Sequence, residues 1–261
     1  MKSIEIVTHA FSGAIPIYWR HMLYQASSLL WHPPEVDVML TLFWAGEQYD
    51  PAMANLVEHI SKRHFLVDAD RMFYFNPVIL PREQLFRRAI GRHMRSQECT
   101  SDVIWYCDAD HYCGEGCIDY ICEHVQDDGR LYGPGRVLIS TDWQTGDAQA
   151  HAGGDWPRIH GEHGFKWQRN KVLIGGSQIL GRETAKRLGY LGDQPKWQRP
   201  VDPEKPFACF RDDSSWRRQH FPLEKQMQVK LAVPNVYRLR HSKSSIDPEG
   251  KRLTSAPAAA Q

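Results

Sequence analysis

The stretch DVIWYCDADHYCGEGC, residues 102–117, joins an apolar run to a pair of closely spaced aspartates. Residues 103–107 are all apolar and rich in β-branched and aromatic side chains, a pattern that predicts a buried central strand. Asp108 and Asp110 follow directly, with Ala109 between them. Two carboxylates just past the end of a strand can turn toward one cation, and such hard oxygen ligands suit Mg²⁺ or Mn²⁺ that substrate phosphates also hold. We therefore expect a metal site at the edge where open α/β sheets bind ligands; the alternative is a solvated acidic turn.

The composition is typical of a globular protein. The chain has 261 residues, of which 42% are hydrophobic and 24% charged, enough for one large α/β domain or two small ones. Its net charge of +1 selects no partner. No apolar run reaches about 18 residues, and the N-terminus lacks the apolar core of a signal peptide, so we expect a cytoplasmic protein. The six cysteines form no Cys-x-x-Cys pair, which favours reduced, buried thiols over a structural zinc site.

Strand-like and helix-like patterns alternate along the N-terminal half of the chain. Strands are predicted at residues 4–11, 36–44, 64–75 and 103–107, with helices at 17–30, from 51 onward and at 81–96 between them. The pair Asp50-Pro51 suits the cap and the first position of the second helix. This order of elements predicts an α/β fold with a mostly parallel sheet flanked by helices. No Gly-x-Gly-x-x-Gly follows the first strand, which counts against a dinucleotide-binding Rossmann enzyme.

The C-terminal half of the sequence is less regular. A strand is predicted at residues 136–141, and residues 142–171 predict a long loop whose histidines and aromatic side chains suggest a binding role. A further strand at residues 172–180 contains Gly175 and Gly176, which would let a ligand approach the backbone closely. The acidic pair that follows at 212–213 opens a helical stretch, which it could simply cap. A short strand at residues 236–242 carries His241, and a flexible tail is expected over 246–261.

The segment TSDVIWYCDADHYCGEGC resembles the Asp-x-Asp segment of GT-A-fold, nucleotide-sugar-dependent glycosyltransferases, particularly family-2-like ones. As an order of elements the resemblance covers roughly residues 1–245. It implies a single GT-A-like domain with a Rossmann-like sheet, in which residues 1–125 bind the donor and 140–243 complete the acceptor side. It also implies that Asp108 and Asp110 bind Mn²⁺ or Mg²⁺, and that this ion bridges the diphosphate of a UDP- or GDP-sugar.

The resemblance further implies a set of donor contacts. The residues in this set are Thr8, His9, Ala10, Glu47, Arg88, Arg92, Asp108, Ala109, Asp110, Gly175, Gly176 and Gln178. The acidic residue after the second strand could be Glu47 or Asp50, and the proline usual at the end of the first strand is absent. Arg88 and Arg92 are four residues apart and share a helical face, so they could reach the donor or make surface ion pairs. His241 would be a further metal ligand, or else a surface histidine.

Catalysis in the family depends on an acidic pair at the position of Asp212 and Asp213. Its second residue, here Asp213, usually acts as the base that takes the proton of the acceptor hydroxyl. The residues expected to contact the acceptor are Trp156, Trp167, Trp216 and Arg217. The ring of Trp216 could instead belong to the core.

The activity implied by the resemblance is transfer of a sugar from a nucleotide-sugar donor to a hydroxyl, with inversion as the commoner outcome. A glycan is the main expectation for the acceptor. Aromatic side chains beside cations also fit stacked bases, so a hydroxymethylated base flipped out of DNA is the second. Two other classes stay open: a nucleotidyltransferase, which would release pyrophosphate, and a catalytically silent domain that binds a metal or a sugar.

Overall fold

The described strands form two β-sheets, which meet at the Asp-x-Asp motif. The computed structural model describes residues 2–12, 17–62, 72–152, 154–159, 161–170, 173, 176–202 and 212–241. Gly175 and the tail predicted at residues 246–261 lie outside the described residues. In the part of the chain that is described, no helix has the length and apolar character needed to cross a membrane.

The large sheet has seven strands in the order β10-β6-β9-β4-β1-β2-β3. The central strand pairs are parallel: β1 with β2 and β4, and β2 with β3. Of the described strands in this sheet, only β9 runs against its neighbours, β4 and β6. The strands are β1 (Ser3–His9), β2 (Asp37–Trp44), β3 (Phe73–Ile79), β4 (Val103–Cys107), β6 (Leu131–Pro134), β9 (Ser177–Gly181) and β10 (Gln228–Leu231). The predicted α/β fold with a mostly parallel sheet flanked by helices is confirmed.

The small sheet has the order β5-β11-β7-β8. Its strands are β5 (His111–Cys113), β7 (Arg136–Ser140), β8 (Phe165–Arg169) and β11 (Val236–Arg238). β11 lies between an antiparallel partner, β5, and a parallel one, β7. Because only residues 108–110 separate β4 from β5, the Asp-x-Asp motif is the joint between the two sheets.

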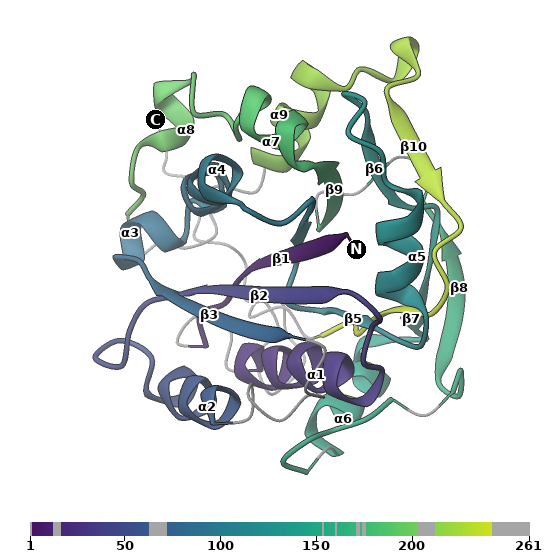
Figure 1. Cartoon of the computed structure of the whole chain (residues 1–261). Helices are drawn as coiled ribbons and strands as arrows, with labels where there is room; N and C mark the ends of the chain where they lie inside the picture. Colours follow the sequence, from purple (N-terminus) through teal and green to yellow (C-terminus); the bar gives the residue numbers. More distant parts are fainter. Residues whose placement is uncertain are drawn as a thin grey trace, which may run out of the picture.

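Helices cover both faces of the large sheet. In Figure 1, α4, α7 and α9 lie on one side of it, and α1 and α2 on the other. The helices are α1 (Tyr18–Trp31), α2 (Pro51–Ser61), α3 (Arg82–Leu85), α4 (Arg88–Glu98), α5 (Cys117–His124), α6 (Trp143–Ala152), α7 (Arg182–Leu188), α8 (Pro195–Gln198) and α9 (Asp212–His220), with a 3-10 turn η1 (Leu223–Lys225). The predicted start of α2 is confirmed, since the Asp50 carboxylate accepts a hydrogen bond from the Met53 amide (3.1 Å) and Pro51 lies in the first turn.

The central strand supplies side chains to two separate cores. β4 is buried along its whole length, as its apolar run predicts. Trp105 belongs to the cluster that includes Met22 of α1, whereas Tyr106 packs on the other face of the sheet with Phe43 and Trp216. Because helices cover both faces, the strand is apolar throughout instead of alternating between apolar and polar residues.

Two predicted element positions were wrong. Residues 142–171, expected to be a loop, contain α6 and β8. The Asp142 side chain accepts from the Thr145 amide (2.6 Å) in the first turn of α6, and β8 pairs antiparallel with β7. The strand expected to end at residue 75 continues to Ile79 as β3. It passes through Pro77, which β3 tolerates because it is an edge strand and an edge needs fewer backbone donors.

A buried ion pair ties α4 to the middle of the large sheet. Glu5 on β1 is fully buried, and its carboxylate accepts from Arg95 Nε (2.6 Å) and Nη2 (3.0 Å). The Thr41 hydroxyl on β2 donates to the same carboxylate (2.6 Å). A buried charge is stable only when it is paired and hydrogen-bonded, so this contact fixes α4 over β1 and β2.

Replacing Arg95 should therefore destabilise the fold strongly. Arg95→Ala leaves Glu5 buried and unpaired, and we expect it to lower the free energy of unfolding by about 3–5 kcal/mol in urea denaturation. The double variant Glu5→Gln/Arg95→Met should recover part of that loss. Lys62→Ala removes the exposed Lys62–Glu58 pair of α2 and serves as the control, with little expected change. An Arg95→Ala protein as stable as the control would contradict the account.

Candidate functional site

The Asp-x-Asp motif is held by backbone hydrogen bonds from two sides. The Asp108 amide donates to the Gly176 carbonyl (2.9 Å), just before β9. The Leu239 amide, just after β11, donates to the Asp110 carbonyl (3.0 Å). The motif thus lies at the carboxyl end of β4 and between two strand ends that come from late in the sequence, a position at which open α/β sheets bind ligands.

Asp108 and Asp213 are joined by two arginines from α4. Arg88 donates through Nη1 to Asp108 Oδ1 (2.5 Å) and through Nη2 to Asp213 Oδ2 (2.8 Å). Arg92 donates through Nη2 to Asp108 Oδ1 (3.3 Å) and through Nη1 to Asp213 Oδ1. We call these four residues the carboxylate–arginine ring. The sequence predicted a shared helical face for the two arginines, and the structure places that face against both acids.

The ring has a buried side and an accessible side. The side chains of Arg92 and Asp213 are 0% and 9% exposed, whereas those of Arg88 and Asp108 are 27% and 29% exposed. On the buried side, the Tyr190 hydroxyl accepts from Arg92 Nη1 (2.9 Å) and has Asp213 Oδ1 (2.7 Å) and Gln178 Oε1 (2.8 Å) within reach as acceptors. A ligand arriving from solvent would therefore meet Arg88 and Asp108 first.

The arginines keep Asp108 ionised. Burial alone would raise the pKa of this carboxyl, but the charges of Arg88 and Arg92 outweigh burial and hold the pKa below its usual value. Asp108 is therefore an anion at neutral pH, which is the form that an ion pair or a metal ligand requires.

Asp110 is paired separately, with residues of the small sheet. Its carboxylate accepts from Arg238 Nε (2.9 Å) and contacts His111 Nδ1 (2.8 Å). Burial would raise its pKa, but Arg238, then His111 and His241, lower it well below the usual value. The ring of His241 lies 5.0 Å from that of His21 and 5.5 Å from that of Tyr18, measured between ring centroids. The role of His241 as a further metal ligand stays a prediction.

The two aspartates fit a cation that also binds substrate oxygens. Asp108 accepts both arginine hydrogen bonds on Oδ1, and a carboxylate has about four lone-pair sites in all, so capacity for a cation remains. Among the described residues, no group of three or more His, Cys, Asp or Glu side chains could hold a metal by itself. Mg²⁺ usually takes one or two carboxylates and completes its coordination with water and substrate phosphates. Asp108 and Asp110 suit such an ion together with a phosphate-bearing substrate.

Asp212 and Asp213, at the start of α9, have different surroundings. Asp213 belongs to the carboxylate–arginine ring, whereas Asp212 is fully buried against the start of α4. Asp212 Oδ2 lies 3.4 Å from the Ala89 amide, which donates to it, and burial raises the pKa of this carboxyl. Asp212 therefore accepts from the first turn of α4, and the alternative that it caps its own helix, α9, stays a prediction.

Gly176 gives Asp108 its space. A Cβ atom at position 176 would lie 2.3 Å from Asp108 Oδ2, far inside contact distance. The expectation that a ligand approaches this glycine needs correction, since the Asp108 side chain itself occupies that space. Gln178 lies on the buried side of the ring, and Ala109 is buried in the core on the α1 side.

The end of β1 lies beneath the arginines. His9 stacks on Phe43 (ring centroids 4.8 Å apart), and in the described structure both of its ring nitrogens are buried with no hydrogen-bond partner. Burial, then Arg92 and Arg88, lower its pKa well below the usual value, so His9 is neutral. Thr8 and Ala10 are buried on either side of it. Donor contacts by these residues stay a prediction.

Of the two candidates after β2, Glu47 is exposed and Asp50 is buried. Besides capping α2, the Asp50 carboxylate accepts from the Ser12 amide (2.7 Å) and contacts the Ser12 hydroxyl. Asp50 therefore ties the chain after β1 to α2, and its carboxylate is committed to that contact.

The predicted acceptor residues do not form one cluster. Trp216 is fully buried, stacked on Tyr190 (4.4 Å) with its Nε1 donating to the Gly189 carbonyl (3.0 Å), so the packing alternative holds and the acceptor role is wrong. Trp156 stacks on His59 of α2 (4.5 Å), on the opposite face of the large sheet from α9. Trp167 lies on β8 beneath the guanidinium of Arg136 (4.2 Å).

Arg217 is the predicted acceptor residue that lies beside Asp213. It follows Asp213 by one helical turn, is half-buried and donates to the Leu173 carbonyl. Burial lowers its pKa, while the charge of Asp213 acts in the opposite direction. Arg217 can therefore act on a group bound next to Asp213.

Tyr190, Tyr18 and Arg238 are not among the residues predicted from the sequence. Tyr190 follows the glycine that ends α7 and reads as part of a turn, and Tyr18 reads as an apolar-face residue of α1. Arg238 had a usable signal, because a charged residue inside a short apolar strand needs a partner.

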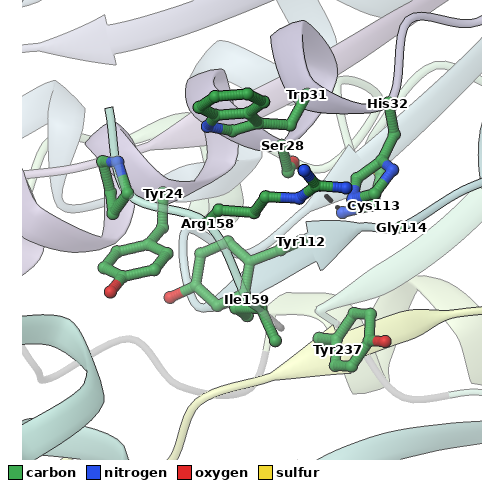
Figure 2. A pocket seen from close by; sticks show the side chains of 11 residues that line it. Tyr24, Ser28, Trp31, His32, Tyr112, Cys113, Gly114, Arg158, Ile159 and Tyr237 are labelled. Atoms are coloured by element: carbon green, nitrogen blue, oxygen red, sulfur yellow. Dashed lines mark hydrogen bonds between the residues drawn. The ribbon is translucent and has the colours of Figure 1, made fainter. Parts of the chain in front are cut away.

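Figure 2 shows a shallow pocket between α1, β5, β11 and residues 157–159. Tyr24, Tyr112 and Tyr237 line it, and the Arg158 guanidinium lies 5.1 Å from the Trp31 ring at its edge. Its interior has room for about one water molecule. The pocket is too small for a sugar nucleotide and does not include the carboxylate–arginine ring.

Comparison with known proteins assigns neither a family nor a function. No protein-family model matches the chain, and no curated protein sequence matches it. Among solved structures, the chain is similar to the apo form of the WbbM bifunctional glycosyltransferase, with a TM-score of 0.46 and 9% identity. The match covers 88% of this chain and 39% of that one, so the chain spans well under half of that protein. Similarity at this level assigns no family, and the function has to be argued from the site.

The contact between Gly176 and Asp108 makes a testable prediction. Gly176→Ala forces the Asp108 carboxylate away from its position and should lower the free energy of unfolding by about 1–3 kcal/mol in urea denaturation. Gly154→Ala is the matched control, because a Cβ at Gly154 meets nothing within 4 Å; its effect should stay within about 0.5 kcal/mol. In the double variant Gly176→Ala/Asp108→Ala the two losses should be less than additive. Fully additive losses would show that the two residues do not interact.

Proposed function

We propose that this chain is a metal-dependent glycosyltransferase that moves a sugar from a nucleotide-sugar donor to a hydroxyl acceptor. The observation that carries the proposal is the carboxylate–arginine ring at the carboxyl end of β4, where Asp108 and Asp213 face each other across Arg88 and Arg92. It places acids that can hold a cation or take a proton beside cations that can bind phosphate. The resemblance of residues 100–117 to the Asp-x-Asp segment of GT-A-fold enzymes supports the same reading.

The donor diphosphate would bind at the accessible side of the ring. Asp108 and Asp110 would hold the divalent cation, with His241 proposed as a further ligand, and Arg88 offers a planar guanidinium suited to phosphate oxygens. A bound cation supplies Lewis-acid stabilisation of the leaving diphosphate. The donor is a UDP- or GDP-sugar in this proposal.

Asp213 would act as the base. In an inverting displacement, the acceptor oxygen forms a bond to the anomeric carbon, the bond from that carbon to the diphosphate breaks, and the hydroxyl proton passes to Asp213. Asp213 contacts Arg88, Arg92 and Tyr190, and these three groups compete with an acceptor hydroxyl for its carboxylate. Arg88 is the most exposed of the three. Arg217, one turn along α9, would help to place the acceptor.

A glycan is the acceptor that we propose. The aromatic side chains that favoured a flipped DNA base, Trp156 and Trp167, lie on separate segments and build no single surface with Asp213. Arg217 beside Asp213 suits a polar acceptor of either kind, so glycan and hydroxymethylated duplex are both tested as substrates.

The products distinguish the three activities considered. Incubation of the protein with Mn²⁺, a UDP- or GDP-sugar and an acceptor should release free nucleoside diphosphate. Release of pyrophosphate from a nucleoside triphosphate would instead identify a nucleotidyltransferase. Binding of the sugar nucleotide with no product under any condition would identify a silent binding domain.

Two substitutions test the roles of the acids. Asp213→Asn keeps the shape of the side chain but removes the proton acceptor, so donor affinity should survive while turnover falls about 10²–10⁴-fold. Asp108→Asn should weaken the Mn²⁺-dependent binding of nucleoside diphosphate, measured by calorimetry. The control is Asp128→Asn, which alters the exposed Asp128–Arg130 pair outside the site and should leave both properties unchanged. Unaltered turnover in Asp213→Asn would refute its assignment as the base.

A further inference from the structure

The acids of the site are already neutralised without any ligand. Asp108 and Asp213 are paired with Arg88 and Arg92, and Asp110 is paired with Arg238. Three carboxylates therefore face three guanidinium groups. A cation entering this site therefore competes with the arginines for the carboxylates, and a phosphate entering it competes with the carboxylates for the arginines.

The arginines differ in how easily they can change partner. Arg92 is fully buried, contacts both acids of the ring and lies against the rings of Tyr190 (5.3 Å) and Tyr106 (5.7 Å). Arg88 and Arg238 are 27% and 32% exposed, and each holds one aspartate of the Asp-x-Asp motif. Arg92 is thus a fixed counter-ion, whereas Arg88 and Arg238 can swing toward solvent or toward a ligand.

Either ligand binds weakly when it binds alone, because it leaves charged groups of the site without a partner. A divalent cation that binds Asp108 and Asp110 must compete with three guanidinium groups for these carboxylates, those of Arg88 and Arg92 at Asp108 and that of Arg238 at Asp110. A diphosphate that takes Arg88 and Arg238 leaves Asp108 with Arg92 alone as its guanidinium partner and leaves Asp110 without Arg238, which is costly for carboxylates at this depth. When both ligands are present, every charge has a partner: the cation pairs with the aspartates, and the arginines pair with the phosphate oxygens.

We infer that Arg88 and Arg238 exchange partners when the donor binds, passing from Asp108 and Asp110 to the diphosphate as the cation takes their place. The inference rests on the proposed function, since it needs a metal–diphosphate substrate. It makes the binding of cation and nucleotide reciprocal, because each ligand removes the cost that the other would incur. It also frees Asp213 from Arg88 when the donor is in place, so the base becomes available only in the loaded site.

Because Arg88 and Arg238 exchange partners, replacing either of them should change the affinity for the cation and the affinity for the nucleotide in opposite directions. Arg88→Gln or Arg238→Gln removes a competitor of the cation, so Mn²⁺ alone should bind about three- to tenfold more tightly than to the unmodified protein. The same variants lose a phosphate contact, so UDP or GDP in the presence of Mn²⁺ should bind more weakly. Mn²⁺ binding is measured by the loss of the free-ion electron paramagnetic resonance signal, and nucleotide binding by calorimetry.

Arg130→Gln is the matched control, because it removes an arginine from the exposed Asp128 pair and should change neither affinity. Arg88→Lys provides a milder variant if Arg88→Gln does not fold, with the same signs and smaller changes. Weaker or unchanged Mn²⁺ binding in both glutamine variants would overturn the exchange. So would Mn²⁺ and nucleotide binding independently to the unmodified protein. A protein that shows the exchange but transfers no sugar would refute the proposed function and leave the exchange standing.

Discussion

The pairing of Asp108 with Asp213 through Arg88 and Arg92 is the interaction on which the site depends. It connects the end of β4, one face of α4 and the start of α9, which are far apart in the sequence. Charged groups at this depth are stable only when they are paired and hydrogen-bonded. The three elements are therefore held in one relative position, and any ligand that alters one partner acts on the others.

Neighbouring strands and helices hold these charged side chains in position. β9 runs against the other strands of the large sheet, and this reversal carries Gly176 to Asp108 and Gln178 to Tyr190. At the start of α4, Asp212 receives the Ala89 amide and so fixes the turn that presents Arg88. The joint between the two sheets lies at residues 108–110, where β11 brings Arg238 to the second aspartate. The fold and the site are consequently built from the same contacts.

Sequence reasoning succeeded where a local pattern has one physical solution. Five apolar residues followed by Asp-x-Asp specified a buried strand with acids at its end, and spacing put Arg88 and Arg92 on one face. It failed where the outcome depends on distant partners. Trp216 is an aromatic residue near an acid in the sequence, yet Tyr190 and Phe221 enclose it. Pro77 lacks a backbone N–H and so predicts the end of a strand, but β3 is an edge strand, in which the missing donor is tolerated.

The most direct test of the central claim is a crystal structure of the protein with Mn²⁺ and UDP or GDP. We predict that the diphosphate lies beside Asp108 and Asp110 with the metal, that Arg88 contacts a phosphate oxygen in place of Asp213, and that Arg92 keeps its contacts with Asp213 and Tyr190. A nucleotide bound elsewhere, with the carboxylate–arginine ring unchanged, would contradict this prediction.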